Sequence, residues 1–430
     1  MTFKYYLVAI IFIIFSSCKI EKQYKQEIQS LSTIDIKYTQ SLQNKVFPFS
    51  FYSTANNVNE ENCEIILRKM QQNGITMFGP YYGFNVVQCY KSAHKLGMKA
   101  IHRLVLYGTD GKNQVSYTTT PQNPAPGYND VKSQIKNLMQ EIVNDPIRND
   151  VIAWWCVAPE ELRYWRKNEM VYLTDLKKAI KETEKELNLK PRPLMMYEPN
   201  NRKAADLVNS GTYGLDIQMR GVYGNSIDDP NWTNLIEVGT QAVAESSVKL
   251  KNIGGVTLNL NKNYATDLSD IKARSYIRVA SYIALLNGAQ AIHIWSWATR
   301  AGLSAQNRDK QVEYYSSVAL DLNGPLHLAN IFLEGTRLDE KKILFVDPAT
   351  NSEFLKYKII HYNNSNYLFI INSSSSKKIE LQSNLILKYE KYNFLENFKN
   401  KSSQISKIDN DKSALNLSLE PLDIVIIQFN

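Results

Sequence analysis

The sequence predicts an α/β protein built around a (β/α)8, or TIM, barrel that is followed by a small C-terminal antiparallel β-sandwich. Between Val46 and Asn323, short apolar runs alternate with amphipathic stretches in which apolar residues return every three or four positions. Strict alternation of strand and helix implies a parallel sheet, and eight repeats fit a closed barrel better than an open sheet. After Pro325 the pattern changes to short strands separated by Asn- and Ser-rich turns.

The elements can be placed individually. Barrel strands are expected at Phe47–Tyr52, Ile75–Gly79, Lys99–Leu106, Val151–Val157, Pro193–Glu198, Gly214–Met219, Gly255–Leu260 and Ala291–Trp297. Helices between them include Glu60–Asn73, Val86–Leu96, Asp130–Asn144, Tyr172–Leu189, Asn231–Glu245 and Leu268–Asn287. Gly74, Gly97 and Gly288 lie just past three of these helices, where a left-handed cap is favoured. The sandwich strands are expected at Ile343–Val346, Lys356–Tyr362, Tyr367–Ile371, Lys378–Gln382 and Asp423–Phe429.

The N-terminal segment predicts export. An apolar run from Tyr5 to Phe15 follows Lys4 and ends at Ser16-Ser17-Cys18. This run is shorter than the roughly 20 residues that cross a bilayer, and its layout is that of a secretion signal. Its ending resembles a bacterial lipoprotein signal, in which Cys18 is lipidated; ordinary cleavage nearby is the alternative. We expect a signal at 1–17, a flexible tether at 18–45, the barrel at 46–335 and the sandwich at 336–430.

This layout places the protein in the bacterial cell envelope, as an outer-membrane or periplasmic lipoprotein held to the membrane by its lipid alone. The net charge of +8 is spread along Lys-rich segments and lacks the concentrated basic stripe typical of nucleic-acid binding. Three further cysteines, Cys63, Cys89 and Cys156, show no metal-ligand spacing. We therefore expect no disulfide framework, no metal and no organic cofactor.

The active site of such a barrel lies at the carboxyl ends of its strands. The candidates there are Tyr81 and Tyr82 after the second strand, His102 and Arg103 on the third, Glu160 and Glu161 after the fourth, Tyr197, Glu198 and Asn200 at the fifth, Asp216, Gln218 and Arg220 on the sixth, Asn259 on the seventh, and His293, Trp295, Trp297 and Arg300 on the eighth. Aromatic rings beside hydrogen-bonding side chains suit a sugar, whose C–H faces stack on rings while its hydroxyls need oriented partners. A carbohydrate is the expected partner.

Hydrolysis of a glycosidic bond uses two carboxyl groups, one that protonates the leaving oxygen and one that acts as nucleophile or activates water. Glu160 and Glu161 follow the fourth strand and Glu198 ends the fifth. Adjacent strands lie about 4.8 Å apart, so these groups can face each other across a sugar. Apolar neighbours such as Trp154 and Trp155 would raise the pKa of one carboxyl, as a general acid requires.

Together these features resemble the retaining (β/α)8 glycoside hydrolases of the large β-glycosidase clan. The resemblance rests on the barrel, the Glu after a Trp-rich fourth strand, the Trp-containing eighth strand and the terminal β-sandwich. It implies an enzyme that hydrolyses O-glycosyl bonds, with Glu160 or Glu161 as acid/base. That clan carries its nucleophile after the seventh strand, whereas the stretch from Gly255 to Lys262 has no carboxylate.

Three interpretations of the second carboxylate remain open. Glu198 is favoured because it ends its apolar run, Asp216 is the rival, and an inactive barrel that binds glycans is the third. A lyase with His102 or Tyr197 as base is a weaker alternative. Four cations follow the strand ends: Arg103, Arg220, Lys262 and Arg300. If at least two of them are not paired with acids, they predict an acidic or sulfated polysaccharide.

Purely structural roles are also open. Pro159-Glu160-Glu161 has the composition of a helix start, and Glu198-Pro199 that of a strand-ending turn. Asp216 can accept a hydrogen bond from Arg220 or a backbone amide. His102 and His293 can be hydrogen-bonded core residues.

Overall fold

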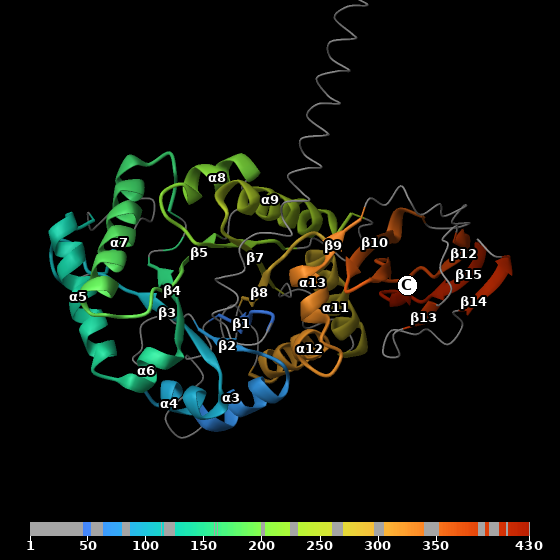
Figure 1. Ribbon diagram of the computed structural model, residues 1–430, viewed down its shortest axis with the longest axis horizontal. Coiled ribbons are helices and arrows are strands. Elements are labelled where there is room, and N and C mark those ends of the chain that lie inside the picture. Colours follow the sequence, from blue (N-terminus) through green and yellow to red (C-terminus); the bar gives the residue numbers. More distant parts are fainter. Residues whose placement is uncertain are drawn as a thin grey trace, which may run out of the picture.

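The computed structural model describes residues 46–52, 63–79, 87–112, 114–115, 125–158, 160, 162–198, 203–223, 231–259, 270–295, 305–338, 352–385, 392–394, 404–409 and 412–429. Within them the chain forms a barrel ringed by helices, with an antiparallel β-domain beside it (Figure 1). The predicted fold class is confirmed.

Eight parallel strands close the barrel in sequence order. They are β1 (Phe49–Phe51), β2 (Met77–Phe78), β3 (Lys99–Leu104), β4 (Ile152–Val157), β5 (Leu194–Glu198), β6 (Ile217–Gly221), β7 (Ile253–Leu258) and β8 (Ala291–Ile294). Closure comes from parallel pairing of β1 with β8, in which Ser50 lies opposite His293. Because a closed sheet has no free edge, each strand presents one face to the lumen and the other to the helices.

Two apolar layers result from this alternation. One layer fills the lumen with strand residues: Met77, Ile101, Trp154, Cys156, Met195, Ile217, Met219, Ile253 and Ala291. The outer layer joins the alternate strand residues to the helices, for example Leu194 and Met196 of β5. Neighbouring residues on one strand therefore point to different compartments.

Six of the described helices overlap the amphipathic stretches named in the sequence. The described helices are α3 (Cys63–Gln72), α4 (Val87–Leu96), α5 (Tyr128–Val143), α6 (Pro146–Val151), α7 (Lys167–Glu186), α8 (Ala204–Gly211), α9 (Asn234–Leu250), α11 (Asp270–Leu286), α12 (Ala305–Asn323) and α13 (Leu328–Glu334). Gly74, Gly97 and Gly288 have positive φ, as their predicted capping positions require. The short helix α6 begins at Pro146, and Asp145 caps it by accepting from the amides of Ile147 and Arg148, both at 3.1 Å.

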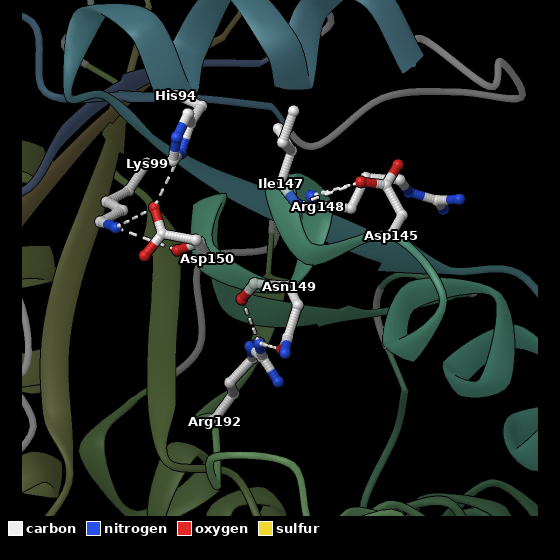
Figure 2. A network of polar contacts seen from close by, with 8 residues as sticks. All are labelled: His94, Lys99, Asp145, Ile147, Arg148, Asn149, Asp150 and Arg192. Carbon is white, nitrogen blue, oxygen red and sulfur yellow. Dashed lines mark hydrogen bonds and ion pairs between the residues drawn. The ribbon is translucent and has the colours of Figure 1, made fainter.

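A polar network closes the amino end of the barrel around α6 (Figure 2). Asp150 accepts from Lys99 Nζ at 3.3 Å and lies 3.2 Å from His94 Nδ1. The buried Arg192, just before β5, donates to Asn149 Oδ1 at 2.6 Å and to the Ile152 carbonyl at 2.7 Å. These contacts join α4, α6 and the first residues of β3, β4 and β5.

The C-terminal domain consists of two antiparallel sheets. One has the order β13 (Tyr392–Phe394), β16 (Ile424–Phe429), β11 (Ser365–Asn372), β10 (Leu355–Tyr362) and β9 (Thr336–Arg337). The other has the order β12 (Ile379–Leu385), β15 (Lys412–Leu419) and β14 (Gln404–Asp409), and a 3-10 turn, η5 (Ser352–Phe354), precedes β10. Apolar residues from both sheets form one common core.

The larger sheet also packs against the barrel. Phe369 of β11 is fully buried and lies 5.3 Å from the ring of Phe332 in α13 and 6.4 Å from that of Tyr282 in α11. Trp232, at the start of α9, donates its indole N–H to the Ser373 carbonyl at 2.6 Å. The barrel and this sheet therefore share one continuous core.

Some boundaries differ from those predicted. The sixth strand begins at Ile217, three residues later than expected, because Gly214 has φ of 118° and belongs to the preceding turn. The sequence pattern did not predict α6, α13, β9, β13, β14 and β15, and it gave no bounds for α8 and α12. The predicted strand Ile343–Val346 lies outside the described residues. Among the described helices, none combines the length and apolarity that a membrane crossing needs.

We predict that Phe369→Ala lowers the free energy of unfolding by about 3–5 kcal/mol, because it empties an aromatic site shared by the barrel and the sheet. Urea unfolding followed by near-ultraviolet circular dichroism measures the change. The matched control, Ile65→Ala on the exposed face of α3, is expected to stay within about 0.5 kcal/mol of wild type. A loss at Phe369 no larger than that of the control contradicts the shared core.

Candidate functional site

The carboxyl end of the lumen carries a set of aromatic and polar side chains. Alternation from the apolar lumen residues places Arg103, Tyr197 and His293 on the inner face of β3, β5 and β8. Tyr52, directly after β1, and Thr257 of β7 lie on the same inner face. Three of the predicted site residues therefore lie on the inner face at the carboxyl end of the lumen.

Aromatic rings cross the lumen at this level. The rings of Tyr52 and Tyr197 lie 5.6 Å apart, although β1 and β5 are on opposite sides of the barrel. Tyr52 also contacts His293 edge-on at 5.3 Å, and the hydroxyls of Tyr197 and Tyr223 lie 2.5 Å apart. We call Tyr52, Tyr197, Tyr223 and His293 the aromatic layer.

The imidazole in this layer is neutral. His293 is fully buried, and burial lowers its pKa to about 3. Its Nδ1 lies 2.6 Å from Ser50 Oγ, while its Nε2 has no hydrogen-bond partner among the described residues. Thr257 lies opposite His293 in the strand register, and its buried hydroxyl likewise lacks a partner within the described part of the chain. Buried polar atoms of this kind are satisfied by water or by a ligand hydroxyl.

The half-buried Arg103 lies opposite Cys156 in the register of β3 and β4. Burial raises the pKa of the Cys156 thiol to about 12, and the nearby guanidinium only partly offsets this. The thiol is therefore protonated at neutral pH and is not a nucleophile. Cys63 and Cys89 are buried free thiols as well.

Three predicted residues stand at the rim of this end and are half-buried: Glu160, Asn259 and Trp295. Asn259 and Trp295 continue the inward alternation of β7 and β8. Glu160 lies in the loop after β4, and since α7 begins only at Lys167, it does not belong to a helix start. Glu160 therefore places a carboxyl group at the carboxyl end of the barrel.

Glu198 does not join this group. It shares the outer face of β5 with Leu194 and Met196, and it is 2% exposed. Its register neighbour is Arg220, whose pKa is lowered by burial against the attraction of Glu198. Arg220 also donates to the Gly239 carbonyl of α9 at 3.1 Å. Both residues thus lie between the strands and the helices.

Two more candidates face outward. His102 lies 2.6 Å from the hydroxyl of Tyr90 in α4, and burial lowers its pKa to about 3. Gln218 donates to the Leu207 carbonyl at 2.8 Å and accepts from Ser246 at 2.7 Å. Trp155, which we expected beside an acid, donates to Glu184 of α7 at 2.8 Å.

Asp216 lies at the opposite end of the barrel from the aromatic layer. It precedes β6, accepts a hydrogen bond from the Leu194 amide at 2.8 Å and is ion-paired with Lys177 of α7. Burial lowers the pKa of Lys177, and the attraction of Asp216 opposes this. The late start of β6 explains the difference from the prediction, and the backbone-amide alternative fits this position.

The remaining candidates lie outside the described residues; they are Cys18, Tyr81, Tyr82, Glu161, Asn200, Lys262, Trp297 and Arg300. Tyr52, Thr257 and Tyr223 were not among the predicted site residues. Tyr52 is the last residue of the predicted first strand, a position where site residues are expected. Glycine is needed at position 221 because a Cβ there would lie 2.9 Å from the Tyr223 ring. Nowhere in the described ranges do three His, Cys, Asp or Glu residues gather as metal ligands.

No family model and no curated protein sequence matches this chain. Solved structures resemble its fold. An α-amylase from H.orenii has a TM-score of 0.51 at 11% identity, with 90% of this chain and 100% of that chain covered. An Anoxybacillus α-amylase has a TM-score of 0.47 at 11% identity, covering 90% and 98%. A GH27 β-L-arabinopyranosidase from Geobacillus stearothermophilus has a TM-score of 0.49 at 10% identity, covering 90% and 96%.

These neighbours are glycoside hydrolases by name, and likeness at this identity concerns the fold. The chain is a (β/α)8-barrel protein with a C-terminal antiparallel β-domain, an arrangement similar to that of the H.orenii α-amylase.

We predict a pH dependence of stability from His293. Its pKa is about 3 in the folded protein and about 6.5 when unfolded, so between these values the unfolded state binds one more proton. Stability from this residue is therefore present above about pH 6.5 and falls by about 1.4 kcal/mol per pH unit on acidification.

Urea unfolding at several pH values between about 3.5 and 6.5 tests this for wild type and His293→Gln. The free energy of unfolding of His293→Gln should depend less steeply on pH than that of wild type, by up to about 1.4 kcal/mol per pH unit. Equal slopes would mean that the imidazole is not buried in its neutral form.

Proposed function

We propose that the chain binds a carbohydrate at the carboxyl end of its barrel and hydrolyses a glycosidic bond there, with Glu160 or Glu161 as general acid. The observation that supports this most is the aromatic layer, in which rings, hydroxyls and a neutral imidazole share one level of the lumen. Tyr52, Tyr197 and His293 are buried and Tyr223 is half-buried, so a sugar would meet this layer at Tyr223 and through hydrogen bonds at its outer edge. Glu160 stands at the rim of the same end.

Glu160 suits the acid role by position. It lies in the loop after β4, at the end of the barrel that carries the aromatic layer, and it is half-buried. A general acid has to reach the leaving oxygen, and a loop at this end of the barrel is where such a group is expected. Glu161 is the neighbouring candidate in the same segment and lies outside the described residues.

A hydrolytic mechanism also needs a second carboxylate, and the two predicted candidates for it lie elsewhere. Glu198 lies on the outer face beside Arg220, and Asp216 is ion-paired at the amino end. We assign both to structural roles in the described arrangement. With these two set aside, the second acid of a hydrolase is not assigned to any of the predicted candidates that the structure describes.

The same observation favours a second candidate function, an inactive barrel that binds glycans. The outer position of Glu198 and the remote position of Asp216 remove two of the expected acids, while the aromatic layer remains intact. A lyase has weaker support because His102 points outward, which leaves Tyr197 as the base.

An acidic or sulfated substrate depends on Arg103. Of the four cations predicted at strand ends, Arg220 is directed toward α9, and Lys262 and Arg300 lie outside the described residues. Arg103 lies on the lumen face of β3 at the carboxyl end of the barrel, which makes it the described member of these four that is directed toward the proposed site.

We also propose that Cys18 carries a lipid that holds the protein to the cell envelope, on the strength of the N-terminal pattern. Expression with a radiolabelled fatty acid should label wild type and leave Cys18→Ala unlabelled and in the soluble fraction. Equal labelling of the two proteins would contradict this proposal.

We predict that Glu160→Gln or Glu161→Gln lowers the turnover of a cleaved oligosaccharide by about 10²- to 10⁴-fold, with affinity nearly unchanged. A panel of end-labelled neutral and acidic oligosaccharides identifies the substrate first, and single-turnover rates and calorimetry are then measured on it. The matched control is Asp216→Asn, which should lower stability and leave turnover per folded molecule unchanged, since it breaks a buried ion pair away from the site.

Three outcomes separate the alternatives. Loss of turnover in Asp216→Asn without unfolding would return that residue to the site. Binding without hydrolysis by wild type would favour the inactive barrel. If wild type neither binds nor cleaves any member of the panel, both candidate functions are wrong.

A further inference from the structure

Two exposed aromatic residues stand on neighbouring loops at the carboxyl end of the barrel. Trp165 lies in the loop between β4 and α7 and is 60% exposed, and Tyr107 follows β3 and is 44% exposed. Because β3 and β4 pair directly, both loops rise from the same side of the barrel. Neither residue belongs to the aromatic layer.

The loop that carries Trp165 is fixed by contacts with a buried carboxylate of α7. Glu169, in the first turn of α7, is 1% exposed and accepts from the Arg163 amide at 2.5 Å. The same carboxylate is ion-paired with the side chains of Arg163 at 3.6 Å and Arg166 at 3.3 Å. Both ends of the segment 163–166 are therefore tied to one buried group.

The Trp165 ring is also supported from the side. It meets the ring of Tyr164 edge-on, with centroids 5.1 Å apart, and the Tyr164 hydroxyl donates to Asp206 of α8 at 2.9 Å. The Trp165 ring is thus exposed to solvent, while its backbone is already held in one conformation by these contacts. Such pre-organised aromatic residues bind ligands at low entropic cost.

Tyr107 shows a similar arrangement on the next loop. Gln134 of α5 accepts from its amide at 2.8 Å and donates to its carbonyl at 3.0 Å. The backbone of Tyr107 also forms an isolated antiparallel bridge with Gln114. This second ring is therefore also carried on a fixed backbone.

We propose that Trp165 forms an outer sugar-binding subsite, on which one pyranose ring of a longer glycan stacks, and that Tyr107 extends this surface over β3. The proposal rests on the proposed function and narrows its substrate class to oligosaccharides or polysaccharides. Trp165 lies five positions after Glu160, a reach of at most about 18 Å, so the two positions lie within a few sugar units of each other.

A sugar fits this surface better than an apolar protein partner. In the sequence, Trp165 is flanked by the cationic residues Arg163, Arg166 and Lys167. A flat ring surrounded by hydrogen-bonding groups matches the two faces of a pyranose, one with C–H groups and the edge with hydroxyls. Protein interfaces instead need a wide contact area.

The test compares a short and a long chain of one sugar, a disaccharide and a hexasaccharide of the type that wild type binds in the panel. Trp165→Ala is expected to weaken binding of the hexasaccharide roughly 2- to 10-fold. Binding of the disaccharide, which ends before the outer subsite, should change less than two-fold. Trp165→Phe should restore most of the affinity for the hexasaccharide, since it keeps a stacking ring.

The matched control is Tyr213→Ala. Tyr213 is 40% exposed in the turn between α8 and β6, at the amino end of the barrel, and its loss should affect neither ligand. Equal affinity of Trp165→Ala and wild type for the hexasaccharide overturns the outer subsite and leaves the proposed function standing. Equal losses for both ligands overturn it as well, because they indicate a general effect on the fold. Absence of glycan binding by wild type overturns the proposed function together with this inference.

Discussion

The closure of the barrel between β1 and β8 is the constraint on which the rest of this structure depends. Once Ser50 is paired opposite His293, the sheet has no edge, and every strand residue faces either the lumen or the helices. The two apolar layers follow from this division. So does the aromatic layer, because Tyr52 and Tyr197 meet only when opposite strands enclose one narrow interior.

The closure of the barrel also determines where the polar side chains of the strands lie. Inward positions bring a neutral imidazole, a guanidinium and tyrosine hydroxyls to one end of the lumen. Outward positions carry structural polar contacts, such as those of His102 with α4 and Arg220 with α9. The amino end holds the ion pair of Lys177 with Asp216 and the network around α6. The proposed sugar site and the polar contacts of the amino end thus lie at opposite ends of the barrel, as is usual for this fold.

The sequence was sufficient to predict the barrel, its eight strands and three glycine caps, because strand–helix alternation and positive φ leave clear patterns. It did not reveal which face each polar residue occupies. Parallel strands buried on both sides read as continuous apolar runs, and all five residues of β5, including Glu198, are buried. A shift in the start of β6 moved Asp216 out of the strand. Without a polarity contrast, the sequence left the strand register and the inward face undetermined.

The most direct test of the central claim is a crystal structure of Glu160→Gln with an oligosaccharide bound by wild type. The account predicts a sugar ring against the aromatic layer, with its glycosidic oxygen next to residue 160 and the rest of the chain directed toward Trp165. A sugar bound only on the C-terminal sheets or at the amino end of the barrel would contradict it.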